Sequence, residues 1–391
     1  MKAIVNTKLV MEDGIIWDGA LTYENGRIVE VGTAESVTIP TDAEIIDAQG
    51  LYTAPGLIDI HNHGSADDLF CDEPMKCSEH FIVHGHTTVL PTFYHDLDLN
   101  RMLDGAAKIR EASKSGAGRI MDGLYMEGPY MSGTGSNQKY IKWIPGEITR
   151  EEYEPLLDGL GDLVRVWAID PNRDGIISFM QDAKANNPRV VFALGHSKAT
   201  MDQCRKVYKY GVKVRTHYSN GGKAKGRCQG SLGAGCDEFA MYEPDMFAEL
   251  ICDQTGVHVT PDLIKTIVRN KGVEKMILIT DSMASKEHFP NNMEDGIWFG
   301  PDLNYDYRGY LCGSRMTLEN GCRNMMTHTG YGLCHSIRMA TINPARMLGI
   351  DDEVGSLEAG KKANLIIIDD AVRVKKVILQ GDLMVENGKL L

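Results

Sequence analysis

Across most of its length the chain alternates short apolar runs with segments of helical periodicity, and this alternation constrains the fold more than any other feature. The runs predict eight strands near residues 57–61, 87–91, 123–127, 164–169, 190–195, 212–217, 250–258 and 276–281. Helical patterns separate most of them, for example over 99–113, 201–210 and 261–270, the last with Thr260 as N-cap and Pro261 at its first position. Eight strand–helix repeats predict an α/β fold, a TIM-like (β/α)8 barrel.

The two ends of the chain have a different character. Residues 1–53 and 350–391 consist of short β-rich runs, with Asn25-Gly26 and Asn387-Gly388 as hairpin-turn signals. Neither end is long enough to make a good core alone, so we expect them to pair into one small β-sandwich domain. The barrel is then expected over 54–349, with an insertion at about 283–312. A doubly wound open sheet is the alternative, but the first strand is not followed by Gly-x-Gly-x-x-Gly.

Composition narrows the class of protein. The chain is 43% hydrophobic and 24% charged, as in an ordinary globular protein, and its net charge of −13 argues against nucleic acid or an anionic membrane as partner. No run approaches the roughly 18 apolar residues of a membrane span, and no signal peptide is evident. Nine cysteines without a Cys-x-x-Cys pair indicate reduced thiols. We expect a cytoplasmic protein without a structural disulfide.

Two histidines with one residue between them, His61 and His63, end the first predicted barrel strand. Side chains alternate along a strand, so both project to the same side. Neutral imidazoles paired in this way can bind a divalent metal. Two hydrogen-bonded structural histidines would give the same pattern, so the pair alone does not decide between the two interpretations.

Four more residues of metal-ligand type end other predicted strands. They are Glu127, His196, His217 and Asp281. Each has an ordinary alternative, because a carboxylate can cap the following helix and a histidine can be a satisfied core residue. Active sites of such barrels lie at the C-terminal ends of the strands. Six candidate ligands at the ends of five strands therefore favour a metal site.

Histidine and carboxylate ligands without thiolate suit one or two divalent ions, zinc first, with iron, manganese and cobalt as alternatives. A bound metal makes a water molecule more acidic, and a nearby carboxylate can accept its proton and later pass it to a leaving amine. Asp281 is the candidate for this proton transfer. Glu127 could bridge two ions if His61 and His63 hold one of them.

A basic, glycine-rich loop stands out in this acidic chain. It contains Lys223, Lys225 and Arg227. Cations and mobile backbone N–H groups together can bind a phosphate. A solvated basic surface is the alternative interpretation.

The shared order of these motifs resembles the amidohydrolase superfamily, and within it the N-acetylglucosamine-6-phosphate deacetylase family. The resemblance runs over nearly the whole chain. It is carried by residues 54–59 with the two histidines that follow, 127–129, 195–200, 216–220, 256–259, 280–281, 313–314 and 340–345. Glu-Gly-Pro at 127–129, in place of a carboxylatable lysine, points to the deacetylase branch.

The resemblance implies that Glu127, His196 and His217 hold a catalytic metal and that Asp281 acts as general base and then as general acid. It implies that the sugar phosphate is contacted by Asn220, Gly221, Arg227 and His258. The implied reaction releases acetate from an N-acetyl amino-sugar 6-phosphate, N-acetylglucosamine 6-phosphate first. The expected partners are this phosphorylated substrate and a second copy of the chain in a homodimer.

Three departures from the family pattern bear on these expectations, one of them the loop Gly221-Gly222-Lys223, where hydrophobic residues are expected. Some members lack the His-x-His pair, whereas this chain has it, so two metals are possible. Where the family has a Gly-Ala-His-Asn-like segment, this chain reads Gly135-Ser136-Asn137-Gln138 and lacks a substrate-facing histidine. The alternative functions are another amidohydrolase activity, such as a cyclic-amide hydrolase or a deaminase, and a non-catalytic barrel scaffold. The first would give no role to the basic loop around Arg227, and a scaffold would typically lose metal ligands, whereas all six are present here.

Overall fold

The computed structural model describes the chain except for residues 66, 96, 133–145, 222–232, 285–299 and 306–310. Within the described residues, eight strands form one parallel sheet. They are β6 (Leu57–Asn62), β7 (His86–Tyr94), β8 (Leu124–Glu127), β9 (Val164–Ile169), β10 (Val191–Leu194), β11 (Val212–Arg215), β12 (Phe247–Ile251) and β13 (Met276–Ile279). The amide of Asp281, just past β13, donates to the carbonyl of His61 on β6 at 2.9 Å and brings the two ends of the sheet together. The predicted barrel is confirmed.

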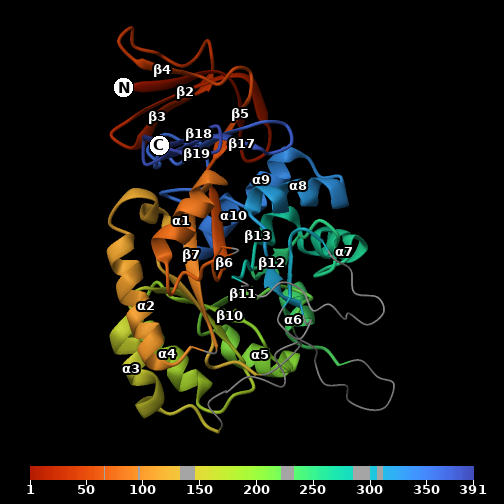
Figure 1. The fold of residues 1–391 in the computed structure, drawn as a ribbon. Coiled ribbons are helices and arrows are strands. Elements are labelled where there is room, and N and C mark those ends of the chain that lie inside the picture. Colours follow the sequence, from red (N-terminus) through yellow and green to blue (C-terminus); the bar gives the residue numbers. More distant parts are fainter. Residues whose placement is uncertain (66, 96, 133–145, 222–232, 285–299, 306–310) are drawn as a thin grey trace.

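Helices cover the outside of this barrel and follow its strands in turn (Figure 1). They are α1 (Pro74–Val83), α2 (Leu99–Ala112), α3 (Arg150–Leu160), α4 (Ile176–Asn186), α5 (Met201–Tyr208), α6 (Cys236–Tyr242), α7 (Pro261–Lys271), α8 (Leu318–Thr329), α9 (Leu333–Met339) and α10 (Ile342–Leu348), with 3-10 turns at Gly116–Ile120 and Val273–Lys275. Thr260 and Pro261 begin α7 as predicted. In the described part of the chain, no helix has the length and apolar character to cross a membrane.

The barrel interior is apolar below its mouth. Ile58, Val166, Ala193 and Ile277 belong to one buried cluster inside the ring of strands, together with the ring of Tyr125 on β8. Successive side chains alternate along a strand, so the residue two positions after an inward-facing one also faces inward. Tyr125 therefore sets the direction of Glu127 at the end of the same strand.

Both ends of the chain contribute to a second sheet, of nine strands in the described residues. Its strands are β1 (Lys2–Val10), β2 (Ile15–Glu24), β3 (Arg27–Thr33), β4 (Glu44–Asp47), β5 (Tyr52–Pro55), β16 (Leu365–Ile368), β17 (Val374–Leu379), β18 (Asp382–Glu386) and β19 (Lys389–Leu390). β5 pairs with β16. A separate apolar cluster contains residues from both ends of the chain, among them Ile28 and Ile378. The expected small β domain is confirmed, whereas its exact boundaries stay a prediction.

Both predicted hairpin turns are present. Asn25 and Gly26 have φ of 51° and 76°, and Asn387 and Gly388 have φ of 51° and 75°. Two consecutive left-handed residues are what a type I′ hairpin needs, and the sequence Asn-Gly supplies them at low cost.

Two strand predictions need correction. The strand predicted over 250–258 is β12 and ends at Ile251, because the carboxylate of Asp253 accepts the amides of Thr255, Val257 and His258 and turns the chain. The strand predicted to reach His217 ends at Arg215, since His217 itself has a positive φ of 25°. In the predicted insertion, β14 (Leu303–Tyr305) pairs with β15 (Leu311–Ser314).

Candidate active site

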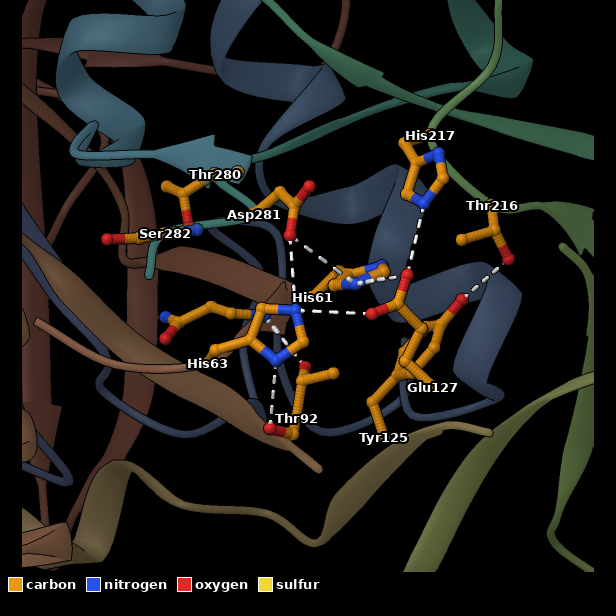
Figure 2. A network of polar contacts seen from close by, with 12 residues as sticks. His61, His63, Thr92, Tyr125, Glu127, Thr216, His217, Thr280, Asp281 and Ser282 are labelled. Atoms are coloured by element: carbon orange, nitrogen blue, oxygen red, sulfur yellow. Dashed lines mark hydrogen bonds and ion pairs between the residues drawn. The ribbon is translucent and has the colours of Figure 1, made fainter. Parts of the chain in front are cut away.

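All six predicted ligands gather at the C-terminal end of the barrel strands, and Figure 2 shows Glu127 with four of the others, His61, His63, His217 and Asp281. His61 lies within β6 and Glu127 ends β8, whereas the others follow their strands by one or two residues. Five of the six are buried, and the side chain of Asp281 is 13% exposed. The side chain best placed to meet a substrate is therefore that of Asp281.

Glu127 lies at the centre of the cluster. Its Oε1 is 3.1 Å from Nε2 of both His196 and His217, and its Oε2 is 3.3 Å from Nε2 of His63. His61 and His63 form one group with Glu127, and His196 and His217 form a second, in each of which the donor atoms lie within 4.8 Å of one another. Glu127 is thus common to two candidate metal-binding groups.

The far sides of the imidazole rings show which nitrogen faces the cluster. Nδ1 of His63 donates to the carbonyl of Thr92 at 3.2 Å, and Nδ1 of His217 donates to the carbonyl of Asn220 at 2.9 Å. A carbonyl only accepts, so in both rings Nδ1 carries a proton. Nε2 of each ring therefore faces the cluster, where it can offer a lone pair to a metal once the ring is neutral, as in metal sites where the second nitrogen is held by a hydrogen bond.

The electrostatics of the cluster favour a cation. Burial opposes a charged imidazole at His63, yet Asp281 and Glu127 raise the pKa of His63 to about 10. Burial also opposes the charged form of Glu127, but the adjacent histidines, His196 foremost, hold the pKa of Glu127 well below its usual range. The shift at His63 reflects the negative charge of the two carboxylates beside it, whereas the shift at Glu127 keeps that carboxylate ionised among its histidine partners.

A divalent metal fits this donor set. Nε2 of His61 is buried and has no hydrogen-bond partner among the described residues, although Glu127 and Asp281 oxygens lie 3.8 Å from it. A cation between these groups would satisfy the imidazole lone pair and the carboxylates together. Imidazole and carboxylate ligands bind zinc, iron, manganese and cobalt, so the ligand types do not distinguish among these metals. The cluster thus supports the predicted use of a divalent metal.

The backbone of Asp281 is held in a fixed conformation by its neighbours, which fixes the position of its carboxylate. Asp281 has a φ of 48°, in the left-handed region that non-glycine residues seldom adopt. Its amide is held by His61, and its carbonyl accepts from the amide of Ser314 at 2.8 Å. A Cβ on Gly313 would lie 2.4 Å from that carbonyl oxygen, so a side chain at Gly313 would disturb Asp281.

A buried brace joins the two strands that carry His61 and Asp281. Oδ2 of Asp59 accepts from the hydroxyl of Thr280 at 2.6 Å and from the side-chain Nδ2 of Asn62 at 3.1 Å. Asp59 is fully buried, and burial raises its pKa to about 6. The brace connects β6 to the residue that follows β13 and precedes Asp281.

The remaining predicted residues have different surroundings. An added Cβ on Gly221 would lie 2.8 Å and 2.9 Å from the ring atoms of His196 and His217, so glycine is required there. Asn220 holds His217 through its carbonyl. His258 is buried, with Asp253 3.1 Å from Nδ1 and the carbonyl of Gly313 3.1 Å from Nε2. Their predicted contacts to substrate stay predictions.

Two of the sequence predictions fall outside the described residues. They are the basic loop with Arg227 and the segment over 135–138.

Two residues of the site were missed from the sequence. His95 follows β7 at the mouth, and its charge is among the influences that act with burial to lower the pKa of His196. Glu249 is fully buried on β12, 3.1 Å from Nδ1 of His61. The signal for Glu249 was a charged residue inside the apolar run Phe247–Ile251, and the misplaced strand boundary hid it.

The amidohydrolase family model matches residues 52–384. The chain belongs to the amidohydrolase family. It is 29% identical to the N-acetylgalactosamine-6-phosphate deacetylase of Escherichia coli O157:H7, over 96% of this chain and 97% of that protein. It is 28% identical to the N-acetylglucosamine-6-phosphate deacetylase of Haemophilus influenzae, over 97% and 98%. The predicted resemblance to these deacetylases is confirmed.

A solved structure shows the same similarity in three dimensions. The N-acetylglucosamine-6-phosphate deacetylase of Pasteurella multocida superposes with a TM-score of 0.83 at 25% identity. The match covers 99% of this chain and 100% of the other. The barrel and the terminal sheet are therefore both part of the shared architecture.

Proposed function

We propose that this amidohydrolase removes the acetyl group from an N-acetyl amino-sugar 6-phosphate. N-acetylglucosamine 6-phosphate is the first candidate, and the galactosamine isomer is the second because one relative carries that name. The observation that supports the proposal best is the position of Glu127 between two histidine groups, with Asp281 beside them at the barrel mouth. The predicted homodimer and cytoplasmic location belong to the same proposal.

The residues that would hold one or two divalent ions, zinc first, are His61, His63, Glu127, His196, His217 and Asp281. When bound, such an ion makes a water molecule more acidic and polarises a carbonyl group. The imidazoles are already oriented by Thr92, Asn220 and Glu249, so little side-chain freedom is lost on binding.

Asp281 would transfer a proton from the attacking water to the nitrogen of the leaving amine. Its carboxylate is the most exposed of the six, so a substrate at the mouth can reach it. As the water oxygen bonds to the acetamide carbon, an Asp281 oxygen accepts the water proton. It donates that proton to the sugar nitrogen as the carbon–nitrogen bond breaks, which leaves acetate and a free amine.

A substrate panel tests the proposal. With added Zn²⁺, Fe²⁺, Mn²⁺ or Co²⁺, the purified protein is expected to release acetate from N-acetylglucosamine 6-phosphate with a KM roughly 10- to 100-fold lower than for the unphosphorylated sugar, the range for one charge-assisted contact. Hydrolysis of a cyclic amide or deamination of a base, with no sugar phosphate consumed, would replace this function by another amidohydrolase activity. A metal-loaded protein inert toward the whole panel would favour a scaffold.

Arg227, predicted from the sequence to bind phosphate, gives a residue-level test. Arg227→Ala is expected to raise KM for the phosphorylated substrate roughly 10- to 150-fold, since a hydrogen bond to a charged group contributes about 1.5–3 kcal/mol. Turnover of the unphosphorylated sugar should stay at the wild-type rate, and Arg269→Ala on the exposed face of α7 should change neither. An equal fractional loss on both substrates would make Arg227 a structural residue.

A further inference from the structure

Glu249 is a buried acid that faces the metal cluster without being one of the predicted ligands. Its Oε2 lies 3.1 Å from Nδ1 of His61 and accepts the backbone amide of His217 at 3.1 Å. One oxygen therefore contacts a residue from each candidate metal-binding group. Oε1 is buried without a hydrogen-bond partner among the described residues.

The position of Glu249 is costly for the fold. It lies in the middle of β12, whose five residues are all buried. A carboxylate buried in a parallel strand lowers stability unless it is paired. The buried Arg215 feels the charge of Glu249, but its hydrogen bonds go to Asp237 and to the carbonyls of Leu194 and Thr216. The hydrogen bonds of Glu249 with His61 and with the amide of His217 lead to the metal cluster instead.

His61 depends on Glu249 in a way that His63 and His217 do not. His63 and His217 are oriented by backbone carbonyls, which a mutation leaves in place. Nδ1 of His61 has a side chain as its described partner. With a proton on Nδ1, Nε2 of His61 is free to bind a metal between Glu127 and Asp281 (Figure 2).

We propose that Glu249 is a positioning residue that holds His61 as a metal ligand within the group His61, His63 and Glu127. In the proposed function this group would hold one ion, and Glu127, His196 and His217 would hold the other. A carboxylate that accepts the second ring N–H fixes the tautomer and raises the basicity of the ligand nitrogen. Without this acceptor, a neutral His61 can carry its proton on Nε2 and donate it to Glu127 or Asp281. This inference rests on the metal site of the proposed function.

Metal titration of the full chain tests the inference without any sugar, so its outcome is separate from the deacetylation assay. We expect the wild type to bind two Zn²⁺ or Co²⁺ ions per chain, counted by mass spectrometry of the metal after equilibrium dialysis. Glu249→Gln keeps the size of the side chain and removes its charge. It should lower the binding affinity for one ion by about 10- to 100-fold and leave the affinity for the other unchanged. The same pattern is expected of His61→Ala.

Glu319 provides a matched control. It is another buried glutamate that contacts Nδ1 of a histidine, His84, at 2.7 Å, away from the cluster. Glu319→Gln should leave both ions in place. Three results would each overturn the proposal. They are a wild type that binds a single ion, unchanged metal affinities in Glu249→Gln, and an equal loss of affinity for both ions in that variant. If Glu249→Gln does not fold, Glu249→Asp, which keeps the charge but withdraws the carboxylate, is judged by the same criteria.

Discussion

Asp281→Asn is expected to lower kcat by about 10²- to 10⁴-fold, the usual contribution of general acid–base catalysis. An amide cannot accept the water proton or return it to the amine. Asparagine tolerates left-handed backbone, so the φ of 48° at this position should be retained. Initial rates of acetate release, measured together with the metal content, provide the check.

The interpretation of this variant depends on its metal. We expect most of the metal to remain, because His61, His63, Glu127, His196 and His217 are unchanged. Asp262→Asn, at a side chain 97% exposed on α7, should behave as wild type. A near-normal kcat in Asp281→Asn with the metal bound would remove Asp281 from the proton transfer.

Glu127→Ala is expected to have the broadest effect on metal binding. Its two oxygens contact His196, His217 and His63, so its loss takes a ligand from both groups. Activity should fall by more than about 10³-fold. A bound metal can lower the pKa of water from about 15.7 to about 7, and a variant that does not hold the metal loses this effect. Metal content per chain and the rate of acetate release would both be measured.

A comparison of variants separates the two groups. Replacing His61 and His63 together should remove the second ion alone, whereas Glu127→Ala should weaken both ions. Glu151→Ala, on the exposed first turn of α3, controls for the loss of a carboxylate in itself. Two ions bound at wild-type affinity in Glu127→Ala would show that Glu127 is not a shared ligand. Full activity in the double variant would leave the His-x-His pair dispensable.

The barrel and its six candidate ligands were predictable because the informative residues lie where strands end. Gly56 and the apolar run after it mark β6, and Glu127 and Asp281 each follow a run too apolar to be anything but buried. Barrel topology then brings these strand ends together whatever the details of the loops. The apolar pattern of the strands and the barrel topology were therefore sufficient to predict which residues lie together at the mouth.

The environment of each ligand was not predictable. His63 and His217 are oriented by the carbonyls of Thr92 and Asn220, and any residue type supplies a carbonyl. The positive φ of His217 and Asp281 arises from contacts between distant segments. Glu249 was visible as a charge in an apolar strand, but its partner is 188 positions away along the chain.

The pairing of β5 with β16 has a consequence for how the protein is made. β5 ends only two residues before β6, yet its partner begins at residue 365 of 391. On the ribosome, the amino-terminal strands emerge with the β5 edge unpaired, and this edge stays unpaired until the entire barrel has been translated. An unpaired edge invites pairing with another chain. Nascent chains that stall within the barrel should therefore be the species most prone to aggregate, and the species that chaperones most need to protect.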